Sequence, residues 1–119
     1  MRAHGVGRVV YQASAMNPAP GQPLPPHLRL LRPLVSRMVD TRGIWADHAA
    51  VIAYLGEAAD DLAWTVTRAG RLGTGPSRGA LVASESPGSA VRYVDLARFS
   101  LETVRSDRHV RACPYLRYA

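Results

Sequence analysis

The chain has 119 residues and a formal net charge of +6, and all 15 of its basic residues are arginine. Because it contains no lysine, a Schiff-base lysine, a phosphate-loop lysine and a tyrosine–lysine proton relay are excluded. With 47% hydrophobic and 20% charged residues, the composition is typical of one soluble globular domain over residues 1–119. No apolar run is long enough to cross a membrane.

The composition also limits compartment, partners and metals. Cys113 is the only cysteine, which excludes an internal disulfide and fits a reducing cytoplasm. The arginines are spread along the chain rather than clustered beside aromatic residues, so we expect neither a nucleic-acid nor a membrane partner. The four histidines have no metal-ligand spacing, so we expect no metal site. The short apolar stretch before Ala13-Ser14-Ala15 is interrupted by Arg8 and Gln12, so we expect no signal peptide.

The first elements follow from apolar runs and prolines. Arg8–Ala13, introduced by a turn at Gly5–Gly7, has the apolar, β-prone character of a strand covered on both faces. Asn17–Pro26 contains five of the nine prolines, which predicts a surface loop. Leu28–Val39 has helical apolar spacing, and Pro33 must either begin this helix or kink it.

A second helix and a second strand follow. Ile44–Ala59 has helical spacing, and its small-residue face, which includes Ile52, Ala53 and Gly56, is suited to lying close against a sheet. Leu62–Thr67 is the second predicted strand.

The C-terminal part repeats this alternation. A long loop at Gly70–Gly79 leads to a short strand at Ala80–Ala83 and then to an amphipathic helix at Val91–Arg105. The residues expected on the apolar side of this helix are Val94, Leu96, Ala97, Leu101 and Val104. Arg111–Tyr118 is predicted as a last strand, and Pro114 argues for an edge position. Strands that alternate with helices in this way predict an α/β fold with a mostly parallel sheet.

Two loops follow the carboxyl ends of predicted parallel strands, where open α/β sheets bind ligands. These loops are Ser14–Asn17 and Arg68–Thr74. Their small residues leave room for a flat cofactor ring, although Ala69 and Gly70 are equally typical of a simple turn.

Four segments, taken in order, carry a resemblance to a known family. GVGRVVYQAS at residues 5–14 resembles a strand ending in a serine pair, and DLAWTVTRAGRL at residues 61–72 resembles the motif LDWTIVRPGRL. GPSRG at residues 75–79 and VRYVDLARF at residues 91–99 are similar to the two motifs that follow. The family is the atypical short-chain dehydrogenases/reductases, which bind NAD(P)H and include NmrA-like proteins and flavin and biliverdin-IXβ reductases.

The resemblance implies a partial, doubly wound Rossmann-like fold, the C-terminal half only. The first four strands of the family, with the glycine fingerprint, would lie before Met1, so we expect a truncated member. Ser14 matches the serine near the nicotinamide and the substrate, and is the candidate catalytic residue. The cofactor-binding positions that the resemblance implies are Ser14, Arg68, Ala69, Gly70 and Leu72.

Several positions depart from the family pattern. Ala13 replaces the first serine of the pair, Ala69 replaces a proline, Ile52 stands where glutamate is frequent, and Arg92-Tyr93 replaces Ser-Arg. The resemblance implies an NAD(P)H-dependent reductase of flavin, quinone or a similar small planar acceptor. The alternatives are a non-catalytic NmrA-like regulatory or binding module, or an inactive remnant. We expect the isolated chain to be inactive, and to self-associate or need a partner chain, because one sheet edge is left bare.

Overall fold

The computed structural model describes residues 4–19, 24–39, 43–59, 61–88 and 90–119. Its helices are α1 (Pro26–Val39), α2 (Ile44–Ala58) and α3 (Tyr93–Val104). The main sheet consists of β1 (Arg8–Ser14), β2 (Ala63–Ala69), β6 (Tyr115–Tyr118) and β4 (Leu81–Ser84), in that spatial order. A second, two-stranded sheet pairs β3 (Leu72–Gly73) with β5 (Val91–Arg92).

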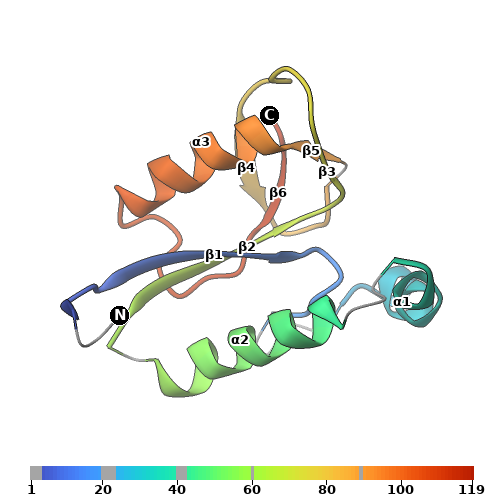
Figure 1. The fold of residues 1–119 in the computed structure, drawn as a ribbon, viewed down its shortest axis with the longest axis horizontal. Coiled ribbons are helices and arrows are strands. Elements are labelled where there is room, and N and C mark those ends of the chain that lie inside the picture. The colour runs from blue at the N-terminus through green and yellow to red at the C-terminus, as the bar shows by residue number, and fades with distance from the viewer. Residues whose placement is uncertain (1–3, 20–23, 40–42, 60, 89) are drawn as a thin grey trace.

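The main sheet is the middle of three layers, with α2 covering one face and α3 the other (Figure 1). β1 pairs with β2 and β2 pairs with β6 in parallel, whereas β4 is antiparallel to β6. The predicted α/β fold with a mostly parallel sheet is therefore confirmed. Among the described residues, no helix has the length and apolar character needed to span a membrane.

Among the described strands, β1 lies at the edge of the main sheet and pairs only with β2. The register runs without a break from Arg8 opposite Ala63 to Ser14 opposite Ala69. At the two ends of the pair, Ala63 N–H donates to the Gly7 carbonyl (2.7 Å) and Ala15 N–H donates to the Ala69 carbonyl (2.8 Å). Since alternate residues of a strand direct their backbone groups to the same side, the odd-numbered residues of β1 face β2 and the even-numbered residues face outward.

Each face of the sheet has its own apolar core. The core under α2 contains Ala13, Ile52, Leu55, Ala59, Leu62, Trp64 and Val66. The core under α3 contains Ala69, Leu81, Val91, Leu96, Phe99 and Leu116. Burial on both faces is seen most clearly in β2, where every residue from Trp64 to Ala69 is buried.

The predicted edge position of the last strand is wrong. β6 lies inside the sheet, between β2 and β4. Pro114 is compatible with this because it stands just before the strand and uses only its carbonyl, which accepts the N–H of Arg68 (2.9 Å). A missing N–H costs nothing at a position that donates no ladder hydrogen bond.

α1 begins two residues before the predicted helix. Pro26 occupies the first helical position, where an N–H has no partner inside the helix, and the Pro25 carbonyl accepts the N–H of Arg29 (3.0 Å). The helix continues through Pro33 to Val39. Residues 20–23 of the predicted proline-rich loop lie outside the described residues.

The sheet-facing side of α2 differs from the predicted one. Ile52 is buried as expected, but Ala53 and Gly56 are exposed, and Leu55 and Ala59 are buried in their place. The buried positions are spaced by three and four residues, and within the helix they carry the large side chains of Ile52 and Leu55 rather than a small-residue stripe.

The inward side of α3 shares only Leu96 with the side predicted from the sequence. Val94, Leu101 and Val104 are exposed, and the buried residues of the helix are Asp95, Leu96, Phe99 and Thr103. The predicted helix start is corrected as well, because Val91 and Arg92 form β5 and the helix begins at Tyr93.

The carboxylate that α3 turns inward belongs to Asp95, and three hydrogen-bond donors hold it there. Its side chain accepts hydrogen bonds from the Ser77 hydroxyl, the Arg78 N–H (2.9 Å) and the Tyr118 hydroxyl (2.7 Å). These donors, led by the Arg78 N–H and the Ser77 hydroxyl, lower the pKa of Asp95. The carboxylate therefore stabilises the fold above its unfolded-state pKa, and that stabilisation is lost as the pH falls through the lower folded-state pKa.

The two leucines of α3 test this orientation directly. Leu96 is 9% exposed and Leu101 is 55% exposed. We expect Leu96→Ala to lower the free energy of unfolding by about 2 to 4 kcal/mol, because it leaves a cavity in the core, and Leu101→Ala to change it by less than about 1 kcal/mol. Urea unfolding of the two variants measures this difference. A similarly large loss for Leu101→Ala would instead support the apolar side predicted from the sequence, which includes both leucines.

Candidate functional site

The carboxyl ends of β1 and β2 bring together the main residues of the predicted site. Ser14 is the last residue of β1 and lies opposite Ala69, the last residue of β2. The hydrogen bond from Ala15 N–H to the Ala69 carbonyl holds the two strand ends together beyond the last pair. Gly70 follows directly, so small residues form this end of the sheet.

Ser14 is half-buried, and its hydroxyl oxygen accepts the N–H of Met16 (3.1 Å). The Ser14 carbonyl accepts the N–H of Asn17 (3.0 Å), which closes a tight turn after the strand. Since the hydroxyl oxygen acts as the acceptor in the turn, its hydrogen remains available to donate to a ligand.

Arg68 lies below this edge, on the face of the sheet that α2 covers. The side chain is 3% exposed. Its Nε donates to the Cys113 carbonyl (2.8 Å) and its Nη1 to the Asn17 carbonyl (3.1 Å). The guanidinium carbon lies 3.7 Å from the centre of the Tyr115 ring. Arg68 therefore ties the Ser14–Asn17 turn to the segment that leads into β6.

Burial sets the protonation of the groups around Arg68. Burial lowers the pKa of the Arg68 guanidinium, while Tyr115 and Cys113 oppose this shift. An arginine nevertheless stays charged at physiological pH. Burial raises the pKa of the Cys113 thiol, with Arg68 opposing. Since a thiol with a raised pKa carries little thiolate near neutral pH, Cys113 is a poor nucleophile.

Asn17 is a site-forming residue that the sequence did not single out. It is fully buried, and its side-chain nitrogen donates to the Trp45 carbonyl in the first turn of α2 (2.9 Å). Its side-chain oxygen is buried without a hydrogen-bond partner among the described residues. The only local signal is an asparagine three residues after the strand end, a position equally typical of a turn.

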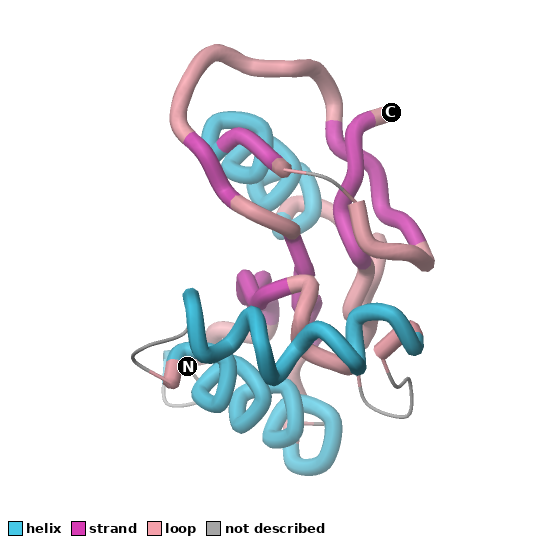
Figure 2. The backbone as a smooth tube through the Cα atoms, turned by 90° about the vertical axis from the view of Figure 1, so that its right-hand side faces the viewer, coloured by secondary structure: helices cyan, strands magenta, loops and turns pink. Residues whose placement is uncertain are grey.

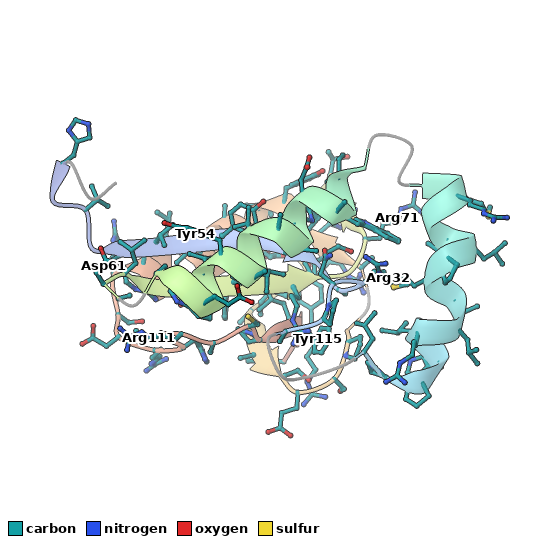
Figure 3. The ribbon with its side chains drawn as sticks, turned by 90° about the horizontal axis from the view of Figure 1, so that it is seen from below. Arg32, Tyr54, Asp61, Arg71, Arg111 and Tyr115 are labelled. Atoms are coloured by element: carbon teal, nitrogen blue, oxygen red, sulfur yellow. The ribbon has the colours of Figure 1, made fainter. Side chains whose placement is uncertain are left out.

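The remaining predicted residues lie apart from this edge or point away from it. Leu72 is in β3, opposite Val91, and packs against the core under α3. Arg71, one residue earlier, is exposed and lies with Arg32 at the end of the molecule where α1 is found (Figure 3). Thus the structure groups Ser14, Ala69 and Gly70, places Arg68 beneath them and directs Leu72 into the core.

Clefts large enough for a ligand lie elsewhere on the described surface. One of about 700 Å3 lies between β4 and the C-terminal end of α3, and includes Phe99 and His109 in its lining. Another, of about 630 Å3, is lined by residues that include Arg68, Cys113 and Glu85. Neither of these two clefts is lined by Ser14, Ala69 or Gly70. The described residues hold no group of three or more His, Cys, Asp or Glu side chains suited to a metal ion.

Comparison with known proteins identifies the fold. No protein-family model matches the chain, and no curated protein sequence matches it. The solved structure of the oxidoreductase ylbE from Lactococcus lactis superposes on 99% of this chain with a TM-score of 0.67 and 14% sequence identity. A protein from Bacillus halodurans assigned as an NAD-dependent epimerase/dehydratase superposes on 99% with a TM-score of 0.61 and 20% identity.

In both comparisons the chain covers 49% of the other protein's length. The chain has half of a Rossmann-type fold. In such folds ligands bind beyond the carboxyl ends of the parallel strands, which is where Ser14, Ala69 and Gly70 meet. The fold class predicted from the sequence is confirmed, whereas the roles of the site residues and membership of the NmrA-like subfamily stay predictions.

Arg68 offers a test of how this edge is held. A lysine in its place keeps the charge but cannot bridge two carbonyls and stack on Tyr115 at once. We expect Arg68→Lys to lower the free energy of unfolding by about 1 to 3 kcal/mol. The control is Arg71→Lys on the exposed loop, with an expected change below about 0.5 kcal/mol. Equal stability of the two variants in urea would show that Arg68 does not tie the site together.

Proposed function

We propose that this chain forms the nicotinamide and acceptor side of an NAD(P)H-dependent reductase. The supporting observation is the meeting of Ser14 with Ala69 and Gly70 at the carboxyl edge of β1 and β2. Small side chains at this edge leave room for a flat ring, and the Ser14 hydroxyl hydrogen is free to donate. The acceptor class that we propose is a flavin, a quinone or another planar molecule, and the compartment is the cytoplasm.

When bound, the reduced nicotinamide would supply a hydride to the acceptor. The residues of this chain would orient the two rings, and the Ser14 hydroxyl would hydrogen-bond to the acceptor atom that gains the proton. With no lysine in the chain, that proton would come from water, from the acceptor itself or through Ser14. Holding donor and acceptor in near-attack geometry can by itself supply about 7 kcal/mol or more of barrier reduction.

The proposal requires a second wall for the cofactor. The sequence has no G-x-G-x-x-G motif, which in Rossmann folds lets the backbone approach the pyrophosphate. The chain spans about half the length of the two solved structures, and β1 has an unpaired outer edge within the described sheet. We propose that a polypeptide segment carrying the first half of the fold pairs with this edge and supplies the pyrophosphate site.

A non-catalytic module that binds the cofactor is the alternative. It is favoured by the absence of lysine and by the alanines at positions 13 and 69, which remove side chains that the related reductases carry. The two proposals differ once the first half of the fold is supplied. A reductase would then oxidise NADPH with a planar acceptor, whereas a non-catalytic module would bind NADPH without oxidising it.

Fragments of the cofactor test the nicotinamide side and the adenosine side of the proposed site separately in the isolated chain. We expect reduced nicotinamide mononucleotide to shift the amide NMR signals of Ser14 and Gly70 with a dissociation constant above about 1 mM, because only one wall is present. We expect 2′,5′-ADP to shift no signals, and NADPH fluorescence to show no saturable binding below about 0.1 mM.

The matched variants are Gly70→Val, which should abolish the nicotinamide shifts, and Gly7→Val at the opposite end of β1, which should not. No atom lies within 4 Å of a side chain added at Gly7, so this control leaves the fold intact. Shifts caused by 2′,5′-ADP, micromolar binding of NADPH or nicotinamide shifts that survive Gly70→Val would contradict the proposal.

A further inference from the structure

We propose that α1 docks on an anionic phospholipid surface through its outward-facing apolar residues. α1 lies beside the proposed cofactor edge, because Arg32 donates to the Met16 carbonyl, but the inference concerns the outward side of the helix and stands whether or not the chain binds NAD(P)H. This proposal departs from the prediction made from the sequence, which was that the chain has no membrane partner. The inference comes from the side of α1 that the fold turns outward.

The apolar residues of α1 face away from the protein. Leu30 is 82% exposed, Leu34 60%, Met38 75% and Leu31 47%. Leu30, Leu34 and Met38 are four residues apart, so they lie in one row along the helix, and Leu31 widens the row. We call these four residues the α1 stripe. A soluble helix normally buries such a stripe, and an exposed one marks an interaction surface.

A charged residue holds the opposite side of α1 against the protein. Arg32 points inward, its Nε donates to the Met16 carbonyl (3.0 Å), and its guanidinium carbon lies 5.8 Å from the centre of the Trp45 ring. Figure 3 shows Arg32 on the side of α1 nearest the sheet. The orientation of the helix is thus fixed by a polar anchor, which leaves the α1 stripe outward.

The charge around the stripe is positive. Arg29 and Arg37 are exposed on α1, as is His27 in its first turn. The sequence has no aspartate or glutamate before Asp40, although five arginines occur in that stretch. A helix with leucines on one face and arginines beside them matches the chemistry of an anionic lipid surface, where the apolar side chains enter the acyl region and the guanidinium groups contact the headgroups.

The shape of this end of the molecule fits a flat surface better than a protein groove. α1 lies at one extremity of the molecule, beyond the ends of β1 and β2 (Figure 1). In the view turned by 90°, it crosses in front of the sheet with its whole length at the surface (Figure 2). The α1 stripe is therefore carried by a helix at the outer end of the molecule, where a fluid bilayer can reach it without a matching shape.

Charge also decides against a second copy of the chain as the occupant. Two α1 helices packed antiparallel would place Arg37 of one beside Arg29 of the other, and a parallel pair would place each arginine beside its own counterpart. Either arrangement brings like charges together, which is destabilising. An anionic surface instead attracts every exposed cation of the helix.

Vesicle sedimentation with the full chain tests the proposal. The probes are vesicles of pure phosphatidylcholine and vesicles that also contain phosphatidylserine, each at low and high salt. We expect binding to the phosphatidylserine vesicles alone, and weaker binding at high salt because ions screen the arginines. The double variant Leu30→Ser/Leu34→Ser should lower the partition coefficient between water and vesicles by at least about tenfold. The reason is that it removes two leucines that would enter the acyl region of the bilayer.

Two further variants make the result specific. Val94→Ser/Leu101→Ser removes exposed apolar residues from α3 and should leave vesicle binding unchanged. Arg29→Gln/Arg37→Gln should weaken binding and reduce its dependence on salt. Circular dichroism of each variant should match the parent, because all the substituted side chains are exposed.

Three results would overturn the proposal. They are no binding to phosphatidylserine vesicles at low salt, equal binding to both kinds of vesicle, or equal loss of binding in the α1 and α3 variants. A dimer in light scattering that Leu30→Ser/Leu34→Ser converts to a monomer, without vesicle binding, would assign the α1 stripe to a second copy instead.

Discussion

The parallel pairing of β1 with β2 is the interaction on which the other elements depend. Its register fixes the position of Ser14 against Ala69, and β2 in turn receives β6 on its other side. Arg8, at the start of β1, donates to the carbonyls of Ala63 (2.8 Å) and Thr103 (3.0 Å). The C-terminal end of α3 is thereby tied to the same pair of strands. Because parallel strands need a crossover, α2 must lie on one face of the pair, and the core beneath it follows.

The pairing of β1 with β2 explains why the candidate site is suited to a cofactor and also why it is incomplete. It brings two strand ends and their small residues to one edge, as Rossmann-type folds require for a cofactor. Yet β1 is the last strand on its side of the described sheet, so no described strand pairs with its outer edge. Arg68 adds rigidity from below by joining Asn17 to Cys113. The site is therefore a prepared surface with one wall.

Local sequence pattern predicted which elements form, and long-range contacts decided how they are turned. The strand at Arg8–Ser14 and the helices at α1 and α2 follow from apolar runs and breakers that act within a few residues. The inward side of α3 does not, because Asp95 is drawn into the interior by Ser77 and Tyr118, which are 18 and 23 residues away. No periodicity within the helix reports those partners.

Pro114 and Asn17 also show that local sequence does not predict contacts with residues far along the chain. From the local sequence, Pro114 predicts an edge strand. The hydrogen bond from the Arg68 N–H to the Pro114 carbonyl shows how β6 instead fits inside the sheet. Asn17 reads locally as a turn residue, although its burial depends on Trp45 and Arg68. The proximity of Ser14 and Ala69 could be predicted from the sequence, because each residue is the last of a strand and the motifs indicated the order of the two strands. The loop geometry around them was not, since it depends on residues far along the chain.

The most direct test of the account is amide hydrogen exchange along β1 in the isolated chain. In an edge strand paired only with β2, the N–H groups of Val9, Tyr11 and Ala13 face β2, while those of Val10 and Gln12 face outward. The account predicts slow exchange at the first three residues and fast exchange at the last two. Slow exchange at all five would contradict it, because the outer edge of β1 would then already be paired and the chain would not be an open half of the fold.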